Sequence, residues 1–268
     1  MTLSQMGIPF VKANACGNDF LLIDTAPLAR DANLAELTRR ICDRHQGVGA
    51  DGVEWMFPHA SADIEIRLVN ADGSEAEISG NGTRCVAAYI CATDEKEKIK
   101  IQTGAGLKTC TLISRVESEY EFEVEMGRPD VGKSMEVSTS TGSVSGIPVS
   151  LGNPHYVIFV PEFADDWQIR AAEIQSSAKF PNGVNVEMVV IENKNSVTVR
   201  FFERGVGETQ SSGTGSCASA VAAVATGRTA SPVLVRSTGG TQTVRLEQGT
   251  VFLRGPARLV CRGEFFLT

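Results

Sequence analysis

The strongest constraint on the fold is a short motif that occurs twice, at a spacing of about half the chain. The sequence SGNG at 79–82 returns as SGTG at 212–215, 133 positions later in a chain of 268 residues. A small, apolar segment follows each copy. A second pair, Gly-Asn at 17–18 and at 152–153, keeps nearly the same spacing. Two pairs at one spacing predict two similar halves, and the chain length fits about two domains.

Alternating, β-rich runs predict that strands dominate the chain. The predicted strands are Phe20–Ile23, Ile64–Val69, Lys98–Thr103, Glu121–Met126, Tyr156–Val160, Val184–Ile191, Ser196–Phe202, Val233–Arg236 and Thr250–Leu253. One helix is predicted at 31–46, ended by Gly47, and a weaker one at 171–178. The segments after Gly82 and Gly215 are apolar on all faces, which predicts helices inside a domain.

Each half is therefore expected to be a β-sheet wrapped around one buried helix. The predicted class is α+β, with two pseudo-symmetric domains. The first domain is expected at 1–114 together with about 257–268, and the second at 115–256.

Composition excludes several classes of partner and location. The net charge is −7 with no basic run, so nucleic acid is not expected as a partner. Seven cysteines, an odd number spread singly, do not form a disulfide scaffold and fit a reducing cytosol. The N-terminus lacks the features of a signal peptide, and the most apolar stretch, 217–225, is too short to span a bilayer. We expect a cytoplasmic protein with no membrane partner.

The two glycine-rich turns predict an anion site. A turn that opens into a helix leaves backbone N–H groups unpaired at the positive end of the helix dipole, where a carboxylate binds as readily as a phosphate. Two such turns facing each other would hold the carboxylate of one small molecule and flank its neighbouring carbon. That geometry suits proton removal on one face and delivery on the other. The alternative is that these glycines serve only as turn and helix-entry residues.

Other sequence motifs give no cofactor or metal site. The G-x-G-x-x-G match at 47–52 follows a helical pattern, and GTGSCA at 213–218 follows a polar run. Neither has, about twenty positions on, an acidic residue in the place that a ribose hydroxyl of a dinucleotide would need. Walker A, HExxH and CxxC motifs are absent, and the three histidines are scattered. We expect no cofactor and no metal.

Several polar residues are candidates, each with a structural alternative. The asparagines in loop-like contexts are Asn18, Asn70, Asn81, Asn153 and Asn185, which singly are more often turn formers. His155 fits a partly buried strand position equally well. Glu203 and Arg204 form either part of a site or a structural ion pair. Cys85 and Cys217 lie in the apolar helices, where small buried residues are the usual interpretation.

Six segments, in this order, resemble the diaminopimelate epimerase family. They are ANACGNDFLLIDT, CDRHQGVGADG, VNADGSEAEISGNGTRC, LGNPHYVIFV, FPNGVNVEMV and ERGVGETQSSGTGSCASAVAA, and the closing GPARLVCRGEFFL is similar too. The resemblance runs nearly end to end. It implies two pseudo-symmetric domains, each around a central helix, and a homodimer. It also implies cofactor-free epimerisation of LL- to meso-diaminopimelate at the α-carbon, for lysine and cell-wall synthesis.

The resemblance implies the roles of individual residues. In the family, one cysteine per domain acts as base or acid, and those two positions are Ser79 and Ser212 here. His155 and Glu203 match groups that tune the catalytic pair. The positions matching substrate-binding residues are Asn18, Asn70, Gly80, Asn81, Asn153, Asn185, Glu203, Arg204, Gly213 and Thr214. Gly52 stands where some members have a glutamine that touches the substrate.

Serine at both positions changes the expected chemistry. An alcohol is about six pKa units less acidic than a thiol, or about 8 kcal/mol, which is roughly a millionfold in rate if it all reaches the barrier. Three interpretations remain open. The chain is an epimerase whose serines are engineered or natural, or a diverged isomerase that uses Ser with His155 or Glu203 on another small carboxylate. The third is an inactive amino-acid-binding protein.

Overall fold

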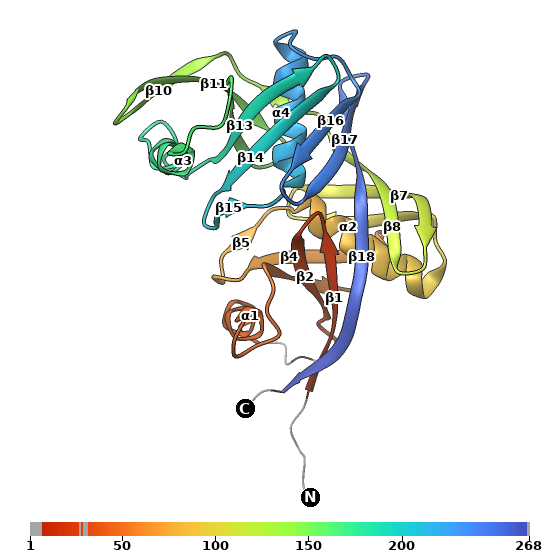
Figure 1. Ribbon diagram of the computed structural model, residues 1–268. Coiled ribbons are helices and arrows are strands. Elements are labelled where there is room, and N and C mark those ends of the chain that lie inside the picture. Colours follow the sequence, from red (N-terminus) through yellow and green to blue (C-terminus); the bar gives the residue numbers. More distant parts are fainter. Residues whose placement is uncertain (1–6, 27, 29–31, 267–268) are drawn as a thin grey trace, which may run out of the picture. The chain divides into compact units, whose positions relative to one another are not determined.

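The computed structural model describes residues 7–26, 28 and 32–266, which form two compact units (Figure 1). Within the described residues, the first unit contains 7–15, 19–122 and 256–266. The second unit contains 16–18 and 123–255. The domain boundaries expected from the sequence stay predictions, because compactness alone does not show that a segment folds independently.

The first unit is built around a mixed sheet. Its strands are β1 (Gly7–Ala15), β2 (Asn18–Asp24), β3 (Gly52–Phe57), β4 (Ile64–Asn70), β5 (Glu75–Ala76), β6 (Lys98–Thr103), β7 (Gly106–Val116) and the start of β8 (Glu119–Gly127). β2 and β3 are parallel, β3 and β4 antiparallel, β4 and β6 parallel, and β6 and β7 antiparallel. The last strand, β18 (Thr250–Phe266), pairs with β1 through its residues 258–266.

The second unit repeats this order of pairings. Its strands are β9 (Asp130–Val131), β10 (Met135–Thr139), β11 (Gly142–Ser150), β12 (Pro154–Phe159), β13 (Asn185–Asn193), β14 (Ser196–Glu203), β15 (Gly207–Thr209), β16 (Val233–Ser237) and β17 (Gly240–Glu247). β12 and β13 are parallel, β13 and β14 antiparallel, β14 and β16 parallel, and β16 and β17 antiparallel. The pairing sense matches that of β2, β3, β4, β6 and β7, which confirms the two similar halves predicted from the repeated motif.

The strand registers of the two units correspond residue by residue. Phe20 on β2 pairs with Gly52 on β3, and His155 on β12 pairs with Asn185 on β13. The second members of these pairs are 133 positions apart, the spacing of the repeated motif. A residue in one unit therefore has an identifiable counterpart in the other.

A buried helix lies at the centre of each unit. α2 (Gly80–Asp94) contacts β1, β6 and β7, and α4 (Gly213–Ala225) contacts β11, β12, β13 and β17. Figure 1 labels both helices beside strands of their own units. Residues 80–88 and 213–223 are buried without exception. The small side chains of these helices let the surrounding strands approach closely, and the predicted sheet around one buried helix is confirmed.

The helix ends differ from the predicted ones for local reasons. α2 and α4 begin at Gly80 and Gly213, earlier than expected, because the preceding serines cap the helices and the glycines lie in the first turn. α1 is shorter than the predicted 31–46, since Asn33 caps its start, and residue 31 lies outside the described residues. α3 extends over Trp167–Gln175 instead of 171–178. Within the described chain, no helix is both long and apolar enough to cross a membrane.

The outer helices close the two apolar cores. α1 (Leu34–Cys42) packs on β3 and β4, where Ile41 joins a cluster with Leu21, Val53 and Trp55. In the second unit α3 packs on β13 in the same way, around Trp167. These cores hold β2–β3 and β12–β13 in the register that positions the polar residues described below.

A single buried hydrogen bond joins α1 to β3 and provides a test of this packing. The Trp55 Nε1–H donates to the Thr38 hydroxyl at 3.0 Å, and both side chains are fully buried. We expect Thr38→Val to lower the free energy of unfolding by about 1–3 kcal/mol, because it leaves the indole N–H unsatisfied. Thr38→Ser keeps the acceptor and should cost less. Urea unfolding measures both, and an equal loss in the two variants would contradict the assignment.

Candidate functional site

Ser79 and Ser212 occupy the N-cap positions of α2 and α4. The Ser79 Oγ accepts a hydrogen bond from the Gly82 amide at 3.0 Å, and the Ser212 Oγ accepts one from the Gly215 amide at 3.2 Å. Both serines have extended backbones, as N-caps require. Each cap satisfies the third amide of its helix, while the helix provides no carbonyl for the first two amides. The repeated motif thus builds the same capping turn twice, of a kind that is suited to bind an anion.

In the second unit the capping serine also contacts a carboxyl group. The Ser212 hydroxyl donates to Glu203 Oε2 at 3.0 Å, and the Thr209 hydroxyl donates to Glu203 Oε1 at 2.6 Å. Burial raises the pKa of Glu203, against the opposing effect of these hydrogen bonds and of His155. A carboxylate with a raised pKa is a stronger base than usual. Glu203 is therefore placed to take the Ser212 proton.

A buried chain of hydrogen bonds leads from β13 to the first turn of α4. His155 Nδ1 lies 2.7 Å from Glu187 Oε1, and His155 Nε2 lies 3.0 Å from Asn153 Oδ1. The Asn153 Nδ2 donates to the Thr214 hydroxyl at 3.2 Å. Burial raises the pKa of Glu187, and His155 opposes that shift. The chain fixes Asn153 and Thr214 beside Ser212, so four predicted site residues lie together: Asn153, His155, Ser212 and Thr214.

Asn185 joins the start of β13 to the end of β14. Its Oδ1 accepts from the Arg204 amide at 2.9 Å, and its Nδ2 donates to the Pro154 carbonyl at 3.0 Å. The Arg204 guanidinium donates to the Asn182 carbonyl at 3.3 Å. Asn185 thus holds the backbone at Arg204, directly after Glu203.

In the first unit, Arg84 organises the start of α2. This fully buried guanidinium donates to Asn81 Oδ1 at 2.7 Å, to the Gly80 carbonyl at 3.1 Å and to the Pro256 carbonyl at 3.1 Å. The bonds fix the Asn81 side chain and add a positive charge to the positive end of the helix. Both effects favour an anion at this turn.

Asn70 and Asn18 lie at strand ends. The Asn70 Nδ2, at the end of β4, donates to the Ser74 hydroxyl at 3.0 Å. Asn18 begins β2 after a turn in which Cys16 and Gly17 have positive φ, and these three residues group with the second unit. Counted by the 133-residue spacing, Asn70 is the counterpart of Glu203. The first unit thus has an amide where the second has the carboxyl that contacts its serine.

The first unit instead buries a different carboxyl under its capping turn. Glu54 on β3 is fully buried, and an added Cβ on Gly82 would lie 1.9 Å from Glu54 Oε1. Among the described residues, neither carboxyl oxygen has a hydrogen-bond partner. Burial raises the pKa of Glu54 to about 8. A group in this environment keeps its proton at neutral pH.

Glu54 and Glu187 are counterparts that the sequence analysis did not single out. They end the triplets Gly-Val-Glu and Asn-Val-Glu, 133 positions apart, and this spacing was the available signal. In the second unit His155 is hydrogen-bonded to Glu187, whereas Phe20, which pairs with Gly52, occupies the position equivalent to His155 in the first unit. The two glutamates therefore share a position but not a partner.

Two further predictions concern Gly52 and metal binding. An added Cβ on Gly52 would lie 2.8 Å from the Val69 carbonyl oxygen, so this backbone has no room for a glutamine at that position. Over the described residues, no group of three or more histidine, cysteine, aspartate or glutamate side chains is arranged to hold a metal ion.

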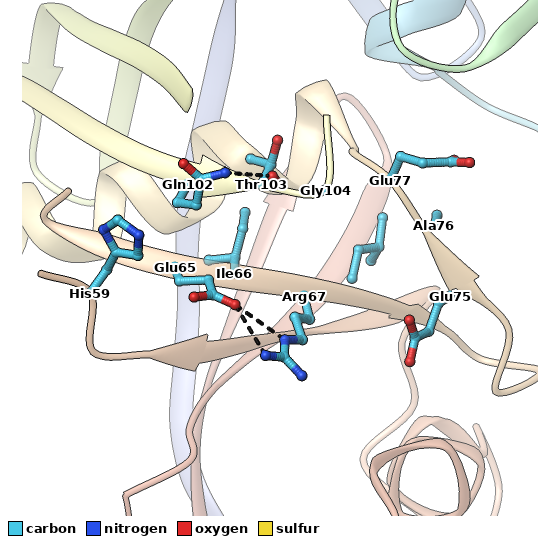
Figure 2. Close-up of a pocket in the computed structure, with 11 residues that line it drawn as sticks. His59, Glu65, Ile66, Arg67, Glu75, Ala76, Glu77, Gln102, Thr103 and Gly104 are labelled. Atoms are coloured by element: carbon cyan, nitrogen blue, oxygen red, sulfur yellow. Dashed lines mark hydrogen bonds and ion pairs between the residues drawn. The ribbon is translucent and has the colours of Figure 1, made fainter. Parts of the chain in front are cut away.

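A pocket of the first unit lies away from the predicted site residues. Figure 2 shows this hollow of about 630 Å³, where β5 and β6 both pair with β4 at different residues. Glu65 and Arg67 form an ion pair across its floor. None of the predicted site residues lines it. At the helix starts themselves lie Ser79, Gly80 and Asn81 in the first unit, and Asn153, Glu203, Ser212, Gly213 and Thr214 in the second.

The raised pKa of Glu54 predicts a specific pH dependence of stability. Between pH 4.5 and about 8 the folded chain keeps the Glu54 proton that the unfolded chain has lost, so the free energy of unfolding falls as pH rises. Glu54→Gln removes this loss. We expect the free energy of unfolding of the variant to rise relative to the parent between pH 5 and pH 8, by at most about 4 kcal/mol. Urea unfolding at both pH values measures it, and a pH-independent difference would contradict the burial argument.

Comparisons with known proteins identify the family. The family model for diaminopimelate epimerase matches residues 10–131 and 147–260. A diaminopimelate epimerase from Elusimicrobium minutum is 37% identical, over 96% of this chain and 98% of the relative. One from Pelotomaculum thermopropionicum is 36% identical, again over 96% of this chain and 98% of the relative.

Solved structures of low sequence identity share the fold. A hydroxyproline epimerase from Agrobacterium vitis has a TM-score of 0.76 at 16% identity, covering 100% of this chain and 94% of that chain. A probable proline racemase from Agrobacterium radiobacter has a TM-score of 0.78 at 16% identity, covering 96% of this chain and 92% of that chain. From the matches of sequence and fold together, the chain belongs to the diaminopimelate epimerase family.

Proposed function

We propose that the chain epimerises LL-diaminopimelate to meso-diaminopimelate by proton transfer at the α-carbon, without a cofactor. The observation that carries this proposal is the contact of the Ser212 hydroxyl with Glu203 at the start of α4. It links a capping turn suited to a carboxylate with an acid–base pair. The curated relatives are named diaminopimelate epimerase, which supports the substrate.

The substrate α-carboxylate binds at the helix starts in this proposal. Backbone amides that form no bond within the helix stand at the positive end of each helix dipole. They belong to Gly80 and Asn81 in α2 and to Gly213 and Thr214 in α4. The reaction requires an acid and a base on opposite faces of one α-carbon. Ser79 and Ser212 are the proposed pair.

Glu203 offsets part of the cost of using an alcohol. An unaided serine is a poor base because its alkoxide forms at very high pKa. When Ser212 takes the α-proton, its hydroxyl proton passes along the 3.0 Å hydrogen bond to Glu203. The proton then ends on a carboxylate whose pKa burial has raised, and no free alkoxide forms. His155 contributes by holding Asn153 and Thr214 in place.

The remaining predicted residues are assigned to the rest of the substrate. Polar side chains suited to the distal amino and carboxylate groups are Asn18, Asn70, Asn153, Asn185, Glu203 and Arg204. A homodimer and a cytoplasmic location also belong to the proposal, the first from the family resemblance and the second from cysteine usage and composition.

A diverged isomerase acting on another small amino or carboxylic acid is the second candidate. The backbone at Gly52 has no room for the glutamine that some family members have there. The distal end of the substrate would then be recognised differently, which favours this second candidate. An inactive amino-acid-binding protein is the third. All three keep the two anion-binding turns, so only turnover separates them.

Restoring the thiols provides the test. We expect Ser79→Cys with Ser212→Cys to raise kcat for LL- to meso-diaminopimelate by several orders of magnitude, with roughly a millionfold as the limit, because a thiol ionises far more readily than an alcohol. Each single replacement should give less. Conversion is followed by NMR or by chromatography of the stereoisomers.

Ser140→Cys, in an exposed turn, is the control for added thiol content. If the doubly substituted chain binds diaminopimelate and stays folded but leaves its α-proton unexchanged, the proposed function is wrong. Turnover of a different amino acid by that variant would favour the diverged isomerase.

A further inference from the structure

The two units differ in the side chains that are placed to exchange a proton with their capping serines. Ser212 donates to Glu203, whereas the counterpart of Glu203 in the first unit is Asn70, whose amide donates to Ser74. An amide neither accepts nor releases a proton at neutral pH. A two-base reaction nevertheless needs a proton acceptor and donor at Ser79 as well.

Glu54 is the carboxyl group placed under that turn. Its Oε1 occupies the space that a Cβ on Gly82 would fill, and the Gly82 amide is the donor to Ser79 Oγ at 3.0 Å. One backbone residue therefore separates the carboxyl from the serine hydroxyl. Only glycine at position 82 permits this approach, since any side chain there would collide with Glu54.

In the second unit, the glutamate at the position equivalent to Glu54 has a structural role that Glu54 does not share. Glu187, its counterpart, is bonded to His155 at 2.7 Å and belongs to the chain that holds Asn153. In the first unit Phe20 occupies the position equivalent to His155, and neither carboxyl oxygen of Glu54 has a hydrogen-bond partner among the described residues. A buried carboxyl with no partner destabilises a fold, and an apolar residue of similar size would pack there without this cost.

We propose that Glu54 is the positioning residue that supplies and recovers the proton of Ser79, as Glu203 does for Ser212. This inference rests on the proposed function and names a further residue in it. Glu54 acts on the substrate only through the serine.

Glu54 and Glu203 together balance the protons in the proposed reaction. When Ser79 gives its hydroxyl proton to the α-carbanion, a Cα–H bond forms and the Oγ–H bond breaks. Glu54 returns a proton to Ser79 Oγ through one bridging water and becomes a carboxylate. On the other face Ser212 takes the α-proton while its own proton passes to Glu203. In the reverse direction the Glu54 carboxylate recovers the proton from Ser79, and Glu203 gives its proton back.

A double-mutant cycle on the full chain tests the coupling of Glu54 to Ser79. Glu54→Gln is made in the parent and in the Ser79→Cys variant, and kcat and KM for diaminopimelate are measured in both directions. In the parent we expect kcat to fall about 100-fold with KM nearly constant, which is the low end of general acid–base contributions. In the Ser79→Cys variant the loss should be at least tenfold smaller, because a thiol ionises without that carboxyl.

The cycle separates a proton-transfer role from a structural one. Equal losses in the two backgrounds would assign Glu54 a packing role and overturn the inference while leaving the proposed function intact. The same holds if Ser79→Cys is active and the parent transfers no proton above a protein-free control. If neither exchanges the α-proton, the proposed function fails first, and this inference with it. Glu54→Met, apolar and of similar length, repeats the cycle if the glutamine variant does not fold.

Discussion

The hydrogen bond that each capping serine accepts from the third amide of its helix determines what the rest of the site can do. Ser79 and Ser212 end the extended segments before α2 and α4 and satisfy one amide each. The first amides of the helices are left directed outward, at the positive end of the dipole. The hydroxyl that caps each helix is then held beside the proposed binding place of the substrate carboxylate. The Oγ atom of each serine therefore both caps its helix and takes part in the proposed proton transfer.

The buried carboxyl groups of the two units differ in their hydrogen-bond partners. In the second unit Glu203 and Glu187 are both partnered, by hydroxyl groups and by His155. In the first unit Glu54 has no partner among the described residues, and Asn70 replaces the carboxyl at the equivalent of Glu203. Pseudo-symmetry of the backbone thus accompanies asymmetry of the acid–base groups. A reaction that removes a proton on one face and returns it on the other uses such a difference.

The repeated motif predicts the two halves and the buried helices, because a period of 133 residues is visible in the sequence. The capping role of the two serines was not predicted, since both helices begin earlier than expected. The partners of those serines were harder to predict. The bond between Thr209 and Glu203 depends on a three-residue strand. Arg84 belongs to no motif of the sequence, and only the structure shows its bond to Asn81. Glu54 was missed because a single carboxyl in a buried strand has no periodicity of its own, and only its counterpart Glu187 marks it.

The central claim is that this chain moves the α-proton with serines at both helix starts. The most direct measurement is deuterium incorporation at the α-carbon of diaminopimelate in heavy water, followed by NMR on the chain as it stands. The account predicts incorporation at the α-position well above a protein-free control. Binding of diaminopimelate without any incorporation would contradict it and would leave the two capped turns as a binding site alone.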